Sequence, residues 1–376
     1  MLLSVAFVTV VLCCGCTQGV GGGQTAAVGD TLQLRYAERL TIVRYAGYTT
    51  VALADPWNEG KTLHRYVLLA DEQDVPAEEC GSTVIHVPLK RCVVTTSVHC
   101  SLVESLGCGD CIGGVCDLQY IHLPFIEAGC RSGRVVDCGS SLSPMVEKII
   151  DMDADALFLS PFQNSGGYGR LEELDIPIIE TADYMETSPL GRAEWMRFYG
   201  LLFGAEDEAD SLFADVEQRY LALKHMAEGR AAERAATVVM DKMTGGVWYV
   251  PGGRSTVGRL IADAGIAYPW MDDEHSGSLA LPFERVLESA ESADMWLFRY
   301  NAPGAMTRGM LLSENEGYAQ FNAFRTGRLY GCNTATSNFY EETPFHPDRL
   351  LRDFITIAHP DLGLGEPRYF LKIEGD

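Results

Sequence analysis

Residues 188–228 read SPLGRAEWMRFYGLLFGAEDEADSLFADVEQRYLALKHMAE and contain no strand pattern. Ser188 is a preferred residue type at a helix N-cap, and Pro189 suits the first helical position. Apolar residues then recur at helical spacing as far as Leu223, with Gly204 as the one point that favours a break. A helix of about 40 residues would reach about 60 Å. That length suits a spine between two lobes better than one layer of a single domain.

On both sides of this segment, short apolar runs alternate with helical patterns. The strand-like runs are Val84–Val87, Cys92–Thr95, Asp155–Ser160, Pro177–Thr181, Thr237–Asp241, Val247–Val250, Asp294–Arg299 and Gly327–Tyr330. The helix-like stretches are Val98–Leu106, Pro144–Ile150, Ser255–Ala264, Phe283–Ser289 and Pro347–Ile357. Strands that alternate with helices predict an α/β fold with mostly parallel sheets. We therefore expect two lobes, each a mostly parallel sheet flanked by helices, joined by one long spine helix.

The segment before the first lobe has a different pattern. Leu40–Ala54 alternates β-branched and aromatic residues around a turn, and Leu63–Leu69 supplies a further strand. These runs predict an N-terminal β addition. The predicted organisation is a lipoprotein signal peptide (1–16), a tether (17–28), the β addition (29–83), an N-terminal α/β lobe (84–187), the spine (188–228) and a C-terminal α/β lobe (229–376).

The first sixteen residues, MLLSVAFVTVVLCCGC, have the length of a signal-peptide core and are too short to span a bilayer comfortably. Gly15-Cys16 supplies the small residue and the cysteine that a lipoprotein signal peptidase requires. We expect acylation at Cys16, followed by a glycine-rich tether, and a periplasmic protein anchored by its lipid. No Lys or Arg precedes the apolar run, and Cys13 stands where such signals usually carry Leu. An ordinary signal peptide or an N-terminal anchor helix are the alternatives.

Composition narrows the class of protein. The chain has 376 residues, 47% of them apolar, which is enough for one large or two medium domains. Its formal net charge of −23 disfavours nucleic-acid binding, since contacts to phosphates need clustered Lys and Arg. No second segment is apolar and long enough to cross a membrane. These features predict an acidic, soluble body.

Twelve cysteines are present, and nine remain beyond Cys16. In an exported protein some of them would form disulfides, but an odd number leaves at least one unpaired within the chain. Cys108 and Cys111 form a CxxC motif, with Cys116 close behind. One interpretation is a metal or redox site. The other is a set of buried thiols, which is favoured because no second CxxC accompanies the first.

Several short motifs resemble those of the class III periplasmic solute-binding proteins of ABC importers, which bind cobalamin, ferric siderophores or haem. The similarity runs from about Val84 to His359. The motifs that carry it include Arg91-Cys92-Val93-Val94, Ile112-Gly113-Gly114-Val115, Gly133-Arg134-Val135-Val136-Asp137, the run 186–195, Gly258-Arg259-Leu260, and Phe283-Glu284-Arg285-Val286-Leu287. The resemblance implies a ligand in the cleft between the lobes. It also implies that Glu147 and Glu284, one on each lobe, meet arginines of the permease, a pairing that electrostatic complementarity would support. The bland alternative is a solvated glutamate at the start of each helix.

Ligands of open α/β sheets bind beyond the carboxyl ends of the strands. This rule selects polar and aromatic residues in the loops of both lobes. In the first lobe they are Thr96, Ser97, His99, Tyr120, Phe162 and Tyr184; in the second they are Trp248, Arg254, Arg299, Tyr300, Asn338 and Tyr340. Aromatic side chains suit a large planar or macrocyclic ligand, and Arg254 or Arg299 would suit an anionic group.

We therefore expect a solute-binding lipoprotein that captures an iron chelate (ferric siderophore or haem) or cobalamin and delivers it to an ABC permease and its ATPase. Haem would need an axial ligand, for which His99, Tyr184 and Tyr300 are candidates. We expect binding without turnover and no catalytic residues, because motifs such as GxSxG and the P-loop are missing. We also expect a monomer without a resident metal or intrinsic cofactor. The alternatives are a metal- or cluster-binding protein or enzyme that uses Cys108, Cys111 and Cys116, and an adhesive surface lipoprotein.

Overall fold

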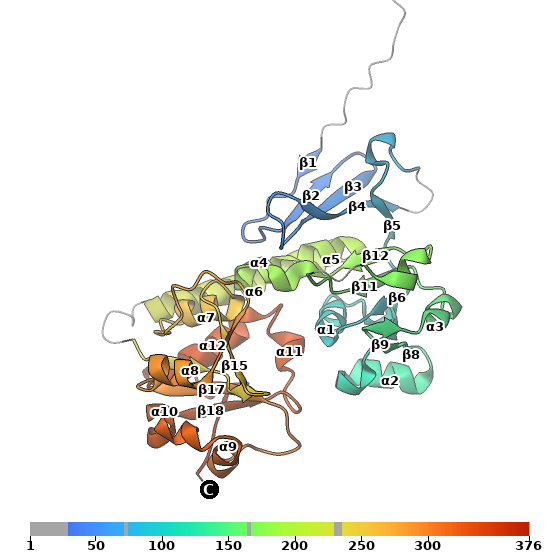
Figure 1. The fold of residues 1–376 in the computed structure, drawn as a ribbon. Coiled ribbons are helices and arrows are strands. Elements are labelled where there is room, and N and C mark those ends of the chain that lie inside the picture. Colours follow the sequence, from blue (N-terminus) through green and yellow to red (C-terminus); the bar gives the residue numbers. More distant parts are fainter. Residues whose placement is uncertain (1–28, 71–73, 164–166, 229–234, 376) are drawn as a thin grey trace, which may run out of the picture.

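The computed structural model describes residues 29–375, apart from residues 71–73, 164–166 and 229–234. The predicted signal peptide with Cys16 and the tether therefore lie outside the described residues. Figure 1 shows two α/β lobes side by side, with helices α4–α6 across one end of both lobes and a separate β-sheet on the far side of those helices. The prediction of a two-lobed α/β fold with an N-terminal β addition is confirmed. No helix in the described ranges has the length and apolarity of a membrane span.

The first lobe is built on a five-stranded sheet of order β12-β11-β6-β7-β8, in which all neighbours are parallel. Its strands are β6 (Cys92–Val94), β7 (Ile112–Val115), β8 (Val136–Asp137), β11 (Ala156–Leu159) and β12 (Ile178–Glu180). Its helices are α1 (Ser97–Ser105), α2 (Pro124–Ser132) and α3 (Val146–Asp151), with a small hairpin of β9 (Gly139–Ser140) and β10 (Ser143–Pro144). Most strand residues are buried on both faces, as expected for a covered parallel sheet.

The second lobe contains two sheets. The larger one has the order β13-β17-β18-β19; its first three strands are parallel and the last is antiparallel. These strands are β13 (Val238–Met240), β17 (Met295–Tyr300), β18 (Leu329–Asn333) and β19 (Leu371–Lys372). The smaller sheet is antiparallel and consists of β14 (Met243–Thr244), β15 (Val247–Pro251) and β16 (Ser278–Leu281). The helices are α7 (Thr256–Asp263), α8 (Phe283–Ala290), α9 (Arg308–Glu314), α10 (Asn322–Thr326), α11 (Phe339–Glu342) and α12 (Pro347–Ala358).

The prediction of one continuous helix over 188–228 is wrong. The segment forms α4 (Pro189–Glu194), α5 (Met196–Phe203) and α6 (Glu206–Glu228). Gly204 ends α5 in the left-handed conformation, and three acidic residues stand in the first turn of α6, where the helix dipole favours them. A long helix does join the lobes, but it is α6 alone, whose 23 residues reach about 35 Å.

α5 and α6 run antiparallel as a helical hairpin. Arg197 of α5 pairs with Asp210 of α6 at 3.1 Å, and Gly200 lies against Ala209. A Cβ atom on Gly200 would meet the Ala209 Cβ at 2.6 Å, so the close approach of these two helices depends on a glycine at this position. The hairpin therefore spans about 35 Å, the length of α6, where a single helix would have reached about 60 Å.

The N-terminal sheet has the order β1-β2-β3-β4-β5, antiparallel except for the parallel pair β4–β5. Its strands are β1 (Asp30–Thr31), β2 (Leu40–Arg44), β3 (Tyr48–Ala54), β4 (Thr62–Ala70) and β5 (Thr83–Val87). The run Val84–Val87, expected in the first lobe, thus belongs to this sheet. The sheet therefore extends beyond the boundary predicted at residue 84.

Two buried carboxylates, Glu194 in α4 and Glu186 just before it, fasten the segment between β1 and β2 of the N-terminal sheet to the helices. Glu194 accepts hydrogen bonds from the backbone N–H groups of residues 35, 36 and 37 at 2.8–3.0 Å. Glu186 accepts from those of residues 38 and 39 and from the Trp195 indole. Charged acceptors of this kind make stronger hydrogen bonds than neutral ones. The N-terminal sheet is thus a fixed part of the molecule, on the side of the hairpin away from the lobes (Figure 1).

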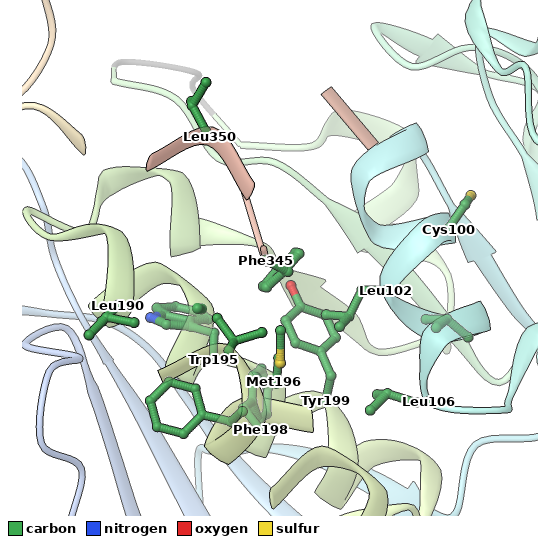
Figure 2. Close-up of a cluster of buried hydrophobic side chains, with 14 of the residues drawn as sticks. Cys100, Leu102, Leu106, Leu190, Trp195, Met196, Phe198, Tyr199, Phe345 and Leu350 are labelled. Carbon is green, nitrogen blue, oxygen red and sulfur yellow. The ribbon is translucent and has the colours of Figure 1, made fainter. Parts of the chain in front are cut away.

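A single hydrophobic core links the two lobes through the hairpin. Figure 2 shows Phe345, from the segment just before α12, close to Tyr199 and Met196 of α5. The ring of Phe345 also meets that of His99 at the start of α1, with centroids 5.9 Å apart. First lobe, hairpin and second lobe therefore share one packed joint.

Candidate functional site

Three strands of the first lobe end at one cavity. Residues that follow β6, β11 and β12 line a hollow of about 300 Å³, together with residues from the helices nearby. Its lining is Thr96, Val98, His99, Ser160, Pro161, Phe162, Thr181, Tyr184 and Arg192. We call it the first-lobe pocket. Phe162 is 55% exposed and Tyr184 38%, so both rings present apolar surface to a ligand.

A matching cavity lies at the carboxyl ends of β13, β17 and β18 in the second lobe. It measures about 260 Å³ and is lined by Asp241, Lys242, Thr244, Tyr249, Arg299, Tyr300, Asn301, Thr334 and Tyr340. We call it the second-lobe pocket. Tyr249 and Tyr340 are each about half exposed. A hollow of about 470 Å³ adjoins it and shares Lys242 and Thr244.

The two pockets flank the contact between the lobes, and we call the region that they bound the cleft. α1 begins at the first-lobe pocket, α11 carries Tyr340 of the second-lobe pocket, and these two helices contact each other.

A buried ionic network forms the floor of the first-lobe pocket. The fully buried Asp183 accepts hydrogen bonds from His99 Nε2 at 2.8 Å and Arg192 Nε at 2.9 Å, while His99 Nδ1 meets the Thr96 hydroxyl at 2.6 Å. Burial alone would raise the pKa of Asp183, but the charges and hydrogen bonds of His99 and Arg192 hold it below its ordinary value. Both ring nitrogens of His99 are therefore occupied.

A second ion pair forms the floor of the second-lobe pocket. Arg299 contacts both carboxylate oxygens of Asp241, at 2.9 and 2.6 Å, in a bidentate arrangement. Burial alone would lower the pKa of Arg299, but the Asp241 charge and its hydrogen bonds raise it above the ordinary value. Asp241 has a φ of 59°, in the left-handed region that Asp and Asn tolerate better than most residues.

Seven of the twelve residues predicted to contact ligand line the two pockets. They are Thr96, His99, Phe162 and Tyr184 in the first lobe, and Arg299, Tyr300 and Tyr340 in the second. Ser97 begins α1 next to the first-lobe pocket but is not part of its lining. Tyr120, 70% exposed, follows β7 on the same carboxyl edge of the sheet without lining that pocket.

The prediction that Trp248 contacts ligand is wrong. Its side chain is fully buried in the second-lobe core, and its indole N–H donates to the Met240 carbonyl at 2.9 Å. The strand that carries it, β15, belongs to the antiparallel sheet, so the rule for parallel strand ends does not apply. For the same reason Arg254, just after β15, lines neither pocket. Asn338 follows the parallel strand β18 but lines a different hollow on the second lobe.

The structure does not support a metal cluster on the CxxC segment. Within the described ranges, no three His, Cys, Asp or Glu side chains gather closely enough to hold a metal ion. Cys116 is buried in the core of the first lobe, whereas Cys108 and Cys111 are half-buried near the surface. Burial raises the pKa of Cys116 to about 12 and also raises the pKa values of the other two thiols, so the reactive thiolate is a minor species of each at neutral pH.

Comparison with known proteins identifies the family. Residues 124–336, more than half of the chain, match the model of the periplasmic binding protein family. The chain belongs to this family.

Two solved structures and one curated relative show how far the similarity extends. A periplasmic haem-binding protein from Pseudomonas aeruginosa superposes with a TM-score of 0.56 at 16% identity, covering 76% of this chain and 95% of that one. An ABC-type Fe³⁺-hydroxamate transport system protein from Saccharomonospora viridis gives 0.55 at 18% identity, covering 72% and 94%. An uncharacterized lipoprotein of Methanocaldococcus jannaschii is 26% identical over 359 residues, covering 90% of this chain and 84% of its own. The predicted resemblance to class III periplasmic binding proteins of ABC importers is thereby confirmed.

The two glutamates predicted to dock this periplasmic binding protein on a permease are both exposed. Glu147 stands in the first turn of α3, is 74% exposed, and approaches Arg170 at 3.7 Å. Glu284 stands in the first turn of α8 on the other lobe. A surface ion pair as long as that of Glu147 contributes little, so this carboxylate can exchange its partner for another arginine.

Sequence reasoning missed several residues that shape the binding protein's cleft. Asp241 and Lys242 follow β13 directly, so the rule that selected Thr96 also applied to them. Asp183 and Arg192 had no such signal, because their role depends on a 2.9 Å contact between a 3₁₀ turn and α4. Tyr249 was hidden by the wrong assignment of β15 to the parallel sheet.

Proposed function

We propose that this periplasmic binding protein captures a metal chelate, an iron complex (ferric siderophore or haem) or cobalamin, in the cleft and delivers it to an ABC permease. The observation that carries the proposal is the pair of aromatic pockets, one at the strand ends of each lobe, that flank the α1–α11 contact. Exposed rings on both lobes suit a large rigid ligand, since aromatic side chains supply contact area at low entropic cost. The fold is shared with proteins named for haem and for Fe³⁺-hydroxamate transport.

Within this proposal, haem ligation by the predicted axial residues is disfavoured. Both nitrogens of His99 have partners. The Tyr184 hydroxyl donates to the Pro161 carbonyl at 2.6 Å, and the Tyr300 hydroxyl accepts from the Met306 N–H at 3.1 Å. Each would have to give up an existing hydrogen bond or change rotamer to reach an iron atom. A chelate whose metal is already fully coordinated needs no protein ligand, so these hydrogen bonds and rotamers can stay as they are.

The remaining parts of the proposal concern location and partners. Acylation at Cys16 would hold the protein on a membrane surface outside the cytoplasm, and a curated relative named as a lipoprotein supports this. Glu147 and Glu284 would meet arginines of the permease, one from each lobe. We propose binding without turnover, no resident cofactor, and a monomer as the working form.

The binding part is tested by calorimetric titration with ferric siderophores, haem and cobalamin. We expect one of these ligands to bind, and Phe162→Ala and Tyr340→Ala, one in each lobe, to weaken it by about tenfold each. Tyr45→Ala is the matched control, because Tyr45 stacks on Tyr48 in the N-terminal sheet, far along the fold from the cleft. Equal losses in all three variants, or unchanged affinity in the two cleft variants, would contradict this location of the site.

The delivery part is tested by reversing both docking charges. The double variant Glu147→Arg/Glu284→Arg should abolish ligand uptake by cells or permease-containing vesicles while the calorimetric affinity stays unchanged, because each lobe would then repel the permease arginines. Uptake at the wild-type rate would refute the docking assignment.

A further inference from the structure

The charged groups of the cleft are already paired with one another. Three cationic side chains line the pockets and the hollow beside them, and each has a carboxylate partner. Arg192 pairs with Asp183 at 2.9 Å, Arg299 with Asp241 at 2.6 Å, and Lys242 with Glu314 at 2.6 Å. Among the described residues that line these three cavities, no Arg or Lys is left without an acidic partner.

Replacing the carboxylate in either buried pair by an anionic group of a ligand would cost considerable free energy. Asp183 is fully buried and carries His99 as well as Arg192, and Asp241 is nine-tenths buried and bound in a bidentate manner. A ligand anion that recruits either guanidinium would leave a buried carboxylate without its partner. Breaking a buried ion pair in this way is strongly unfavourable.

The remaining polar groups of the cleft are uncharged. Hydroxyl and amide side chains stand between the aromatic rings of both pockets; they are Thr96, Ser160, Thr181, Thr244, Asn301 and Thr334. All but Thr244 already take part in hydrogen bonds within the protein. The lone pairs and amide N–H groups that these bonds leave can meet the amide or hydroxamate groups of a ligand without the desolvation cost of an ion. In addition, the formal net charge of −23 repels an approaching anion before it reaches the cleft.

From these observations we propose that the cleft selects metal chelates without net negative charge, of the ferric hydroxamate or corrinoid amide type, and rejects ferric catecholates and haem. This inference rests on the proposed function and narrows its ligand class. The inference rests on the two ion pairs that form the floors of the pockets, Arg192–Asp183 and Arg299–Asp241, taken together.

The test compares ligands of different charge on the purified protein by calorimetry. The probes are ferric desferrioxamine, with a single positive charge, uncharged cyanocobalamin, the ferric complex of a synthetic tricatecholate, with three negative charges, and haemin. We expect at least one of the first two to bind about a hundredfold more tightly than either anionic probe. If the tricatecholate or haemin binds as tightly as the best of the other two, the inference fails and the proposed function stands. If no probe binds, both fail.

A charge variant tests the cause of the selection. Asp241→Asn keeps the shape and tolerates the left-handed backbone, but it frees the charge of Arg299. We expect the ratio of tricatecholate to desferrioxamine affinity to rise by about tenfold or more. Glu314→Gln, at a partly exposed partner, should act in the same direction through Lys242 even if Asp241→Asn folds poorly.

Asp151→Asn is the matched control, since it changes the net charge equally on an exposed residue at the end of α3. If the ratio of tricatecholate to desferrioxamine affinity is unchanged in both cleft variants, or rises equally in the control, the ion pairs of the pocket floors do not cause the selection.

Discussion

At the residue scale, one buried carboxylate organises the first-lobe pocket. Asp183 joins α1 through His99 and α4 through Arg192, and it lies 3.4 Å from the Tyr199 hydroxyl of α5. Removing its charge leaves two buried cation-forming groups without a counter-charge. The residue therefore supports the pocket, the hairpin and the joint between the lobes at once.

We predict that Asp183→Asn lowers the free energy of unfolding by about 3 kcal/mol at pH 7. Because the folded-state pKa of Asp183 is depressed, its contribution is present above the unfolded-state pKa of about 3.9 and is lost as pH falls through the folded value. The gap between wild type and variant should therefore narrow below about pH 4. Urea denaturation at several pH values measures it, with Asp151→Asn as the exposed control. A gap that is the same at pH 7 and in acid would contradict this role.

Each residue that was correctly predicted from a strand end follows or ends a parallel strand, although Ser97, Tyr120 and Asn338 also follow parallel strands and line neither pocket. Thr96 and Arg299 stand at such strand ends, and both line the cleft. The prediction for Trp248 failed because a short apolar run of sequence is compatible with a strand of either a parallel or an antiparallel sheet. The pairing that decides between them, Trp248 with Leu281, joins residues 33 positions apart and leaves no local signal.

At the element scale, the helical hairpin departs most from expectation. The apolar spacing continues through Gly204, so periodicity alone predicts one helix. The sequence did contain the stop and start signals, a glycine followed by Ala205 and three acidic residues, but these do not say in which direction the second helix runs. The direction is decided by packing, through the contact of Gly200 with Ala209.

The variant Gly200→Ala distinguishes the effect of helix propensity on stability from the effect of packing between α5 and α6. Helix propensity alone predicts a gain of about 1 kcal/mol for alanine inside α5. The structure predicts instead a loss of about 1–3 kcal/mol, because the new Cβ would overlap the Ala209 Cβ and the Ala205 carbonyl. Thermal unfolding gives the sign. The double variant Gly200→Ala/Ala209→Gly should recover part of the loss, and a stabilised single variant would rule out the hairpin contact.

At the scale of the whole molecule, the joint between the lobes is reinforced from two sides. Phe345 packs against His99 and Tyr199 on the cleft side of the hairpin, and Glu186 and Glu194 fasten the N-terminal sheet on the other. Two lobes linked by a packed joint of this kind move by small shear rather than by wide hinge closure. This reason for modest motion does not depend on a single continuous helix between the lobes.

We therefore expect the radius of gyration to change by less than about 1 Å on ligand binding. Small-angle X-ray scattering of the protein with and without its ligand measures this change. A large compaction would show that the joint opens in the free protein.

The most direct test of the central claim, that the cleft carries a metal chelate, is the mass and absorbance of the protein purified from its native source. We expect a bound small molecule with a ferric charge-transfer band or a corrinoid spectrum, removed by denaturation. A colourless protein whose thermal stability is unchanged by ferric chelates, haem and cobalamin would contradict the account.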